Sequence, residues 1–130
     1  HLKPFLSNPK IIFKNHVKQK KLTNLYNNSH LFVTTSLEEG LAMVQPQAMA
    51  CGLPVICTTN SGGSEIVDEG INGFVCPIRD IEYLKNKISF FYNNRDQLKN
   101  FSENSYKKAR KDLSWDNYSQ KVYEEYKKLI

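Results

Sequence analysis

Short apolar runs separated by helical segments constrain the fold of this chain most. The runs Ile11–Phe13, Leu31–Thr35, Pro54–Thr58 and Gly73–Pro77 are strand-sized and show no regular polar–apolar alternation. Strands of this kind are typical of a parallel sheet that helices cover on both faces. The sequence therefore predicts an α/β domain with a Rossmann-like parallel sheet.

Helical patterns lie between these runs and after them. Apolar spacing predicts helices over Lys18–Asn28, Met43–Cys51, Asp80–Tyr92, Asp96–Leu113 and Ser114–Ile130. We expect Asp80 and Ser114 to cap their helices, and Gly52 to end the second helix in a C′ position. Glu65–Asp68 fits a single helical turn, and the three helices over residues 80–130 close the domain.

The formal net charge of +5 is unevenly distributed. Residues 1–30 carry six Lys and no acid, residues 31–78 carry five acids and no Lys or Arg, and residues 79–130 carry twelve bases and eight acids. The basic ends leave open a binding module for nucleic acid or an anionic membrane surface. Aromatic interleaving, which single-stranded nucleic acid requires, is only partial in residues 1–30.

The number and spacing of the cysteines and histidines argue against disulfide bonds and against a metal site. Cys51, Cys57 and Cys76 are odd in number and widely spaced, which favours a reducing cytoplasm over a disulfide scaffold. No Cys-x-x-Cys pair occurs and the three His are scattered, so we expect no metal site. The chain opens on His1 rather than Met, and we expect that further sequence precedes it.

The segment Ser36–Pro54 follows a predicted strand, makes a turn and opens a helix. Such a turn lies at the carboxyl end of a parallel strand, where ligands bind in open α/β sheets, and main-chain N–H groups there favour anions. A phosphate site is one interpretation. An ordinary strand–turn–helix link is equally compatible, because no Lys or Arg lies nearby and no phosphate-loop glycine pattern occurs.

This segment resembles the donor-binding signature of the retaining glycosyltransferases of family 4 (group 1, GT-B fold). The matching residues are Ser36, Glu39-Gly40, AMACGLPVI (48–56), SGGSEIV (61–67) and DEGINGFVCPIRD (68–80). The resemblance implies that residues 1–130 are part of the C-terminal, donor-binding half of a two-domain enzyme. It places the first strand–helix unit of this half, and the acceptor-binding domain, upstream of His1.

The resemblance also implies roles for single residues. Glu39 would be the catalytic residue that holds the transferred sugar, whereas adjacent Glu38 fits a solvated surface acid. Gln47 stands where the family has a second Glu, and it would accept from ribose hydroxyls without charge assistance. The implied donor-binding residues are Gly40, Leu41, Ala42, Met43, Val44, Gln47, His16 and Val17.

The implied function is transfer of a hexose, with retention, from a UDP-sugar or GDP-sugar to a saccharide or lipid-linked acceptor in cell-surface polysaccharide synthesis. No metal cofactor and no nucleic-acid partner are implied. The family's Arg and Lys that stabilise the diphosphate would lie upstream, so we expect this chain to bind nucleotide weakly and transfer no sugar. The resemblance implies a cytoplasmic location, and peripheral binding to the inner membrane face remains an open alternative. A different Rossmann-type fold with another nucleotide ligand is a third alternative.

Several neighbouring residues have structural interpretations. We expect Gly62-Gly63 to permit positive φ in a loop, with Glu65 bonding that loop, and Met49 and Cys51 to belong to the core. The helical stripe of Trp115, Tyr118 and Tyr126 fits core better than a carbohydrate platform. In the GT-B architecture the last helix crosses to the partner domain, so its apolar face would not be fully buried in this chain.

Overall fold

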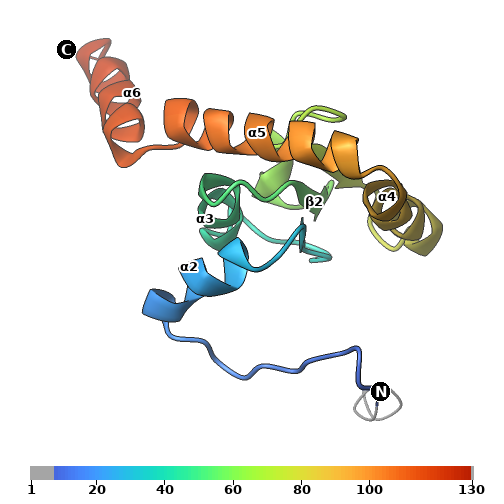
Figure 1. Cartoon of the computed structure of the whole chain (residues 1–130). Coiled ribbons are helices and arrows are strands. Elements are labelled where there is room, and N and C mark those ends of the chain that lie inside the picture. Colours follow the sequence, from blue (N-terminus) through green and yellow to red (C-terminus); the bar gives the residue numbers. More distant parts are fainter. Residues whose placement is uncertain (1–7, 130) are drawn as a thin grey trace.

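The computed structural model describes residues 8–129. Within these residues three strands form one sheet, and five α-helices and a short 3₁₀ helix are arranged around it (Figure 1). In chain order the elements are α2 (Gln19–Asn27), β1 (Phe32–Val33), α3 (Val44–Ala50), β2 (Val55–Thr58), η1 (Gly62–Glu65), β3 (Gly73–Cys76), α4 (Ile81–Asn93), α5 (Arg95–Asp112) and α6 (Trp115–Lys127).

The sheet is parallel, in the order β1-β2-β3, with β2 at its centre. Phe32 pairs with Val55, and the four residues of β2 pair with the four of β3 from Val55–Gly73 to Thr58–Cys76. All four positions of β2 are buried, which explains why this segment shows no polar–apolar alternation. The prediction of a parallel α/β sheet is confirmed.

Successive residues of β2 point to opposite faces and enter two separate cores. Val55 and Cys57 lie in one core, with Met49 of α3. Ile56 lies in the other, where the rings of Phe74, Phe90, Phe91 and Phe101 pack with centroids 5.0–6.0 Å apart. The long helix α5 runs across the sheet and contributes to both cores (Figure 1). Helices therefore cover both faces, as predicted.

Two helix caps and one helix-ending glycine occur at the residues that the sequence predicts. The Asp80 carboxylate accepts from the Tyr83 N–H at 2.9 Å, and the Ser114 hydroxyl accepts from the Asn117 N–H at 3.1 Å. Gly52 follows α3 with φ of 79°, in the left-handed region. All three predicted end signals are confirmed.

Two predicted elements are wrong or displaced. Ile11–Phe13 forms no strand and lies in an irregular segment, where the side chain of Ile12 is 77% exposed. A strand needs a paired neighbour and a buried face, and this segment has neither among residues 8–129. The helical turn expected at Glu65–Asp68 occurs instead as η1, three residues earlier.

The aromatic stripe of α6 is not core in this chain. Trp115 is 72% exposed and Tyr118 is 61% exposed, because α6 leaves the end of α5 and projects from the sheet (Figure 1). The core interpretation is wrong, and the expectation that this chain cannot fully bury the helix is confirmed. Met49 is buried as predicted, whereas Cys51 is only half-buried. No helix in residues 8–129 combines the length and apolar character needed to cross a membrane.

The aromatic core predicts a large stability difference between two Phe→Ala substitutions. Phe74→Ala should lower the free energy of unfolding by about 3–5 kcal/mol, because Phe74 packs against three other rings. Phe13→Ala is the matched control and should change it by less than about 1 kcal/mol, since Phe13 is exposed in the irregular segment. Urea denaturation measures both, and equal losses would contradict the described packing.

Candidate functional site

The loops that follow β1 and β2 continue the pairing of these two strands beyond the sheet. The backbone N–H of Glu39 donates to the carbonyl of Asn60 at 3.1 Å. The Gly62 N–H donates to the carbonyl of Glu39 at 3.1 Å, and Glu39 forms a parallel bridge with Ser61. The backbone of Glu39 is therefore fixed at the carboxyl edge of the sheet, where open α/β folds bind ligands.

The side chain of Glu39 is also oriented. The Ser36 hydroxyl donates to Oε2 of Glu39 at 2.7 Å. Ser36 is itself held by Thr58, whose hydroxyl donates to the Ser36 carbonyl at 2.6 Å. Glu39 is exposed, and its Oε1 has no hydrogen-bond partner among the described residues. The arrangement presents a pre-oriented carboxylate oxygen that can accept from a ligand hydroxyl.

A run of backbone donors follows Glu39 directly. Leu41, Ala42 and Met43 form the turn before α3, and Val44 is the first residue of that helix. Within residues 8–129 none of their four N–H groups donates to a backbone carbonyl. The structure thus brings Glu39, Gly40 and residues 41–44 together in one turn, as a carboxylate followed by free N–H donors.

Gly62 and Gly63 bring the second loop onto this turn. A Cβ on Gly62 would lie 2.5 Å from the Leu41 nitrogen, and a Cβ on Gly63 would collide with Oε1 of Gln45. Neither glycine has positive φ, so the predicted conformational reason is wrong. Both are required by close approach, which the sequence cannot reveal because it depends on a contact between separate loops.

The remaining predicted residues lie at the margin of this turn or apart from it. Gln47 is half-buried on α3, and its N–H donates to the Met43 carbonyl. His16 and Val17 lie in the irregular segment before α2 and form no hydrogen bond with the turn among the described residues. Glu38 and Glu65 are exposed, and no side-chain bond joins Glu65 to its loop in the described part of the chain.

The thiol of Cys57, on β2, is buried beneath the two loops. Burial raises the pKa of the Cys57 thiol to about 11, although a hydrogen bond with Ser61 opposes this. The thiol is therefore neutral at physiological pH. In residues 8–129 no group of three or more His, Cys, Asp or Glu side chains could hold a metal ion.

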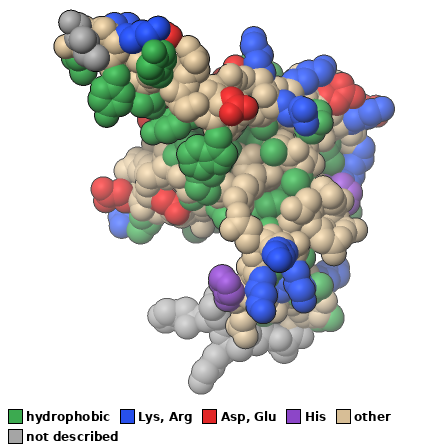
Figure 2. All heavy atoms as spheres, turned by 90° about the vertical axis from the view of Figure 1, so that its left-hand side faces the viewer, with side chains coloured by type: hydrophobic (Ala, Val, Ile, Leu, Met, Phe, Trp, Pro, Cys, Tyr) green, Lys and Arg blue, Asp and Glu red, His purple; other side chains and the backbone are tan. Residues whose placement is uncertain are grey.

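One concave site, a groove, lies beside the turn, and another, a cavity, lies at the far edge of the sheet. The groove, of about 340 Å³, lies between Leu41, Met43 and Pro46 on one side and Leu113 and Trp115 on the other. Figure 2 shows large apolar side chains near the top of this face, where α6 projects. The groove borders the candidate site and is almost wholly apolar in its lining.

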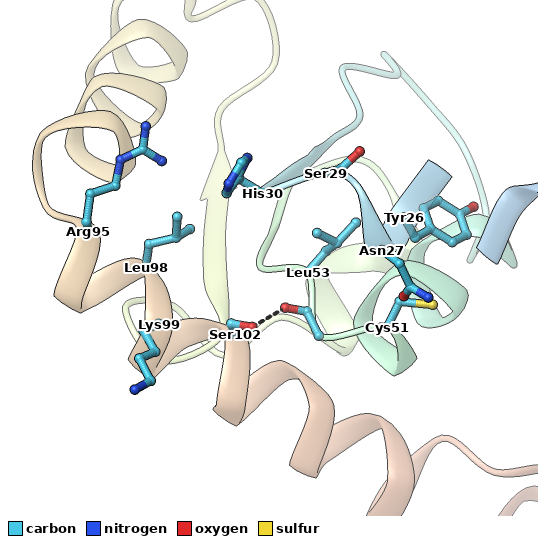
Figure 3. Close-up of a pocket in the computed structure, with 11 residues that line it drawn as sticks. Tyr26, Asn27, Ser29, His30, Cys51, Leu53, Arg95, Leu98, Lys99 and Ser102 are labelled. Atoms are coloured by element: carbon cyan, nitrogen blue, oxygen red, sulfur yellow. Dashed lines mark hydrogen bonds between the residues drawn. The ribbon is translucent and has the colours of Figure 1, made fainter. Parts of the chain in front are cut away.

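A cavity of about 620 Å³ lies at the opposite edge of the sheet, next to the residues that precede β1 and β2 (Figure 3). Its cationic residues are Arg95 and Lys99 at the start of α5. Their side chains extend in opposite directions in Figure 3, so the two charges do not converge on one point. The carboxyl edge, by contrast, combines an oriented charged group with backbone N–H groups that have no backbone acceptor among residues 8–129.

Comparison with known proteins identifies sequence relatives of most of this chain. Residues 5–108 match the model of the family described as "Glycosyl transferases group 1". Spore coat protein SA of Bacillus subtilis (strain 168) is 30% identical over 122 residues, which cover 91% of this chain and 32% of that protein. The chain belongs to the group 1 glycosyltransferase family.

Solved structures show the same fold. HepE from Anabaena, in complex with UDP-glucose, aligns with a TM-score of 0.84 at 21% identity over 98% of this chain and 35% of that one. The C-terminal domain of LpcC, a group 1 family glycosyltransferase from Francisella tularensis, aligns with a TM-score of 0.78 at 19% identity, covering 88% of this chain and 59% of that one. The chain thus spans about a third of spore coat protein SA and of HepE.

The contact between the two loops predicts different effects for two Gly→Ala substitutions. Gly62→Ala should lower the free energy of unfolding by about 1–3 kcal/mol, because the new Cβ displaces the backbone of Leu41. Gly40→Ala is the control in the same loop pair, where a Cβ meets no atom within 4 Å, and should change it by less than about 0.5 kcal/mol. Chemical denaturation of both variants measures this, and a neutral Gly62→Ala would contradict the contact.

Proposed function

We propose that this chain is the donor-binding part of a retaining glycosyltransferase, which transfers a hexose from a UDP-sugar or GDP-sugar to a saccharide or lipid-linked acceptor. The observation that carries the proposal is the carboxylate of Glu39, fixed by Ser36 and followed by the N–H groups of residues 41–44, which have no backbone acceptor within residues 8–129. Membership of the group 1 family supports it. A structure of HepE with UDP-glucose, in the same fold, supports a nucleotide-sugar ligand.

Glu39 suits the sugar end of such a donor. A hexose ring presents neighbouring hydroxyl donors, and an ionised carboxylate accepts from two of them more strongly than a neutral oxygen does. Oε2 is already occupied by Ser36, so Oε1 is the oxygen that faces the sugar in this proposal. Because Ser36 and the Asn60–Gly62 loop fix the residue before the ligand arrives, little ordering accompanies binding.

The N–H groups of residues 41–44 suit the diphosphate. They provide directed donors without a charge, and residues 31–78 contain no Lys or Arg to neutralise phosphate. The cations that stabilise the leaving diphosphate would come from sequence upstream, as the family resemblance implies. We assign no metal to this role, since the sequence has no Asp-x-Asp motif. Binding by this chain alone is therefore weak.

Gln47, His16 and Val17 complete the proposed donor site. Gln47 follows the turn on α3 and would accept from a ribose hydroxyl, while His16 and Val17 would border the base. The two residues of the irregular segment require that segment to approach the turn when nucleotide binds. Their contribution belongs to the base, so it should be the same for UDP and for a UDP-sugar.

The rest of the enzyme would bind the acceptor. In this proposal α6 crosses to the preceding domain, and its exposed aromatic face, which includes Trp115 and Tyr126, packs there. The three cysteines are free thiols, which supports a cytoplasmic location. Cell-surface polysaccharide synthesis is the proposed process, with acceptors supplied at the inner membrane face.

A second candidate function rests on the lysines around α2. Lys18, Lys20 and Lys21 are exposed, and Figure 2 shows a group of basic side chains on this face at the level of α2. Such a group can bind an anionic membrane or a nucleic acid. Salt-sensitive binding to anionic vesicles or DNA, without any binding of UDP-glucose, would favour this function over the first.

Titration calorimetry with UDP, GDP and their hexose conjugates tests the proposed function. The chain should bind one nucleotide series with a dissociation constant of about 1 mM, near −4 kcal/mol, and its sugar conjugate more tightly. Mixed with donor and acceptor saccharides, it should release no nucleotide. Absence of binding at millimolar concentrations in both series would contradict the proposal.

Glu39→Ala should separate the sugar from the nucleotide. We expect its affinity for the nucleotide sugar to fall about tenfold, to that of the free nucleotide, while nucleotide affinity is retained, because a charge-assisted hydrogen bond is lost. Glu38→Ala, the neighbouring exposed acid, is the matched control and should bind both as the unaltered chain does. Equal losses for nucleotide and nucleotide sugar in Glu39→Ala would exclude the sugar role.

A further inference from the structure

Gln45 is a polar side chain in an unexpected place. It lies in the first turn of α3, it is 0% exposed, and among residues 8–129 neither Oε1 nor Nε2 has a hydrogen-bond partner. The other buried residues of this helix are Ala48 and Met49, which are apolar. A buried amide without partners destabilises a fold, and an apolar side chain of the same size would avoid this cost. The presence of the amide therefore indicates a function that an apolar residue cannot perform.

The position of the amide links it to both loops of the candidate site. Oε1 of Gln45 lies against Gly63, in the space that a side chain there would fill. Gly63 follows Gly62, whose N–H holds the carbonyl of Glu39 and whose Cα faces the Leu41 nitrogen. A continuous path of contacts thus runs from Gln45 through the two glycines to Glu39.

We propose that Gln45 is a positioning residue of the nucleotide-sugar site: its amide sets the distance between the Gly62-Gly63 turn and α3, and thereby the position of Glu39. The inference rests on the proposed function. Gln45 itself does not touch the donor, because it is fully enclosed beneath the turn. Its action is indirect, through Gly63 and Gly62.

The chemistry of an amide suits this role. Its oxygen lies in the space that a Cβ on Gly63 would fill, and a carbonyl oxygen attracts the polarised Cα–H of glycine. A methylene chain of equal length fills a similar volume but supplies neither the planar shape nor the acceptor. Only an amide at position 45 therefore supplies both the shape and the acceptor, even though it makes no conventional hydrogen bond.

Gln45→Met separates positioning from folding. Met matches Gln in length and removes two unpaired buried polar atoms, so the melting temperature should stay the same or rise. The affinity for the sugar conjugate of the preferred nucleotide should fall at least fivefold, and by more than the affinity for the nucleotide alone, because Glu39 shifts. Gln97→Met, the same change on an exposed position of α5, is the matched control and should alter neither quantity.

Calorimetry and thermal unfolding of the full 130-residue chain decide the outcome. Weaker sugar-conjugate binding at an unchanged or higher melting temperature supports the inference. Unchanged affinities in Gln45→Met overturn it, and so does a lower melting temperature with equal losses for both ligands, which marks a purely structural residue. If the unaltered chain binds no nucleotide, the proposed function fails, and the inference fails with it.

Discussion

The backbone pairing between Glu39 and the Asn60–Gly62 loop is the interaction on which the site depends. It continues the parallel pairing of β1 and β2 past the ends of the strands, so the two loops are joined as one unit. This unit fixes the Glu39 carboxylate, and in the described part of the chain the N–H groups of residues 41–44 have no backbone acceptor. Pre-ordered groups of this kind bind a polar ligand without first losing conformational entropy.

The sheet makes this pairing possible by burying β2 on both faces. Val55 and Cys57 anchor the strand to one core and Ile56 anchors it to the other, and this packing holds β2 between β1 and β3. Because the loop and the helix pack so closely, the residues where they meet must be glycine. Gly62 and Gly63 meet that need, and the buried amide of Gln45 occupies the space between them and α3.

Local signals were sufficient to predict part of this structure. Asp80 and Ser114 act through hydrogen bonds within their own helices, and Gly52 acts through its own φ, so sequence alone identified them. The strand expected at Ile11–Phe13 depends on a paired neighbour, and no propensity supplies one. No sequence pattern indicated a role for Gln45, because its proposed role depends on contact with Gly63, eighteen residues further along the chain. The family motif implied a role for Glu39 in holding the sugar, but the contact with Ser36 that orients its carboxylate needed the structure.

The central claim is that the turn at the carboxyl edge of the sheet receives the nucleotide sugar. An amide NMR titration of the 130-residue chain tests it most directly. Addition of UDP-glucose, or of the conjugate that calorimetry identifies as preferred, should shift the amide signals of Leu41, Ala42, Met43 and Val44 first, together with that of Gly62. Shifts confined to the lysines of α2, or to Arg95 and Lys99 at the opposite edge, with residues 41–44 unmoved, would contradict the account.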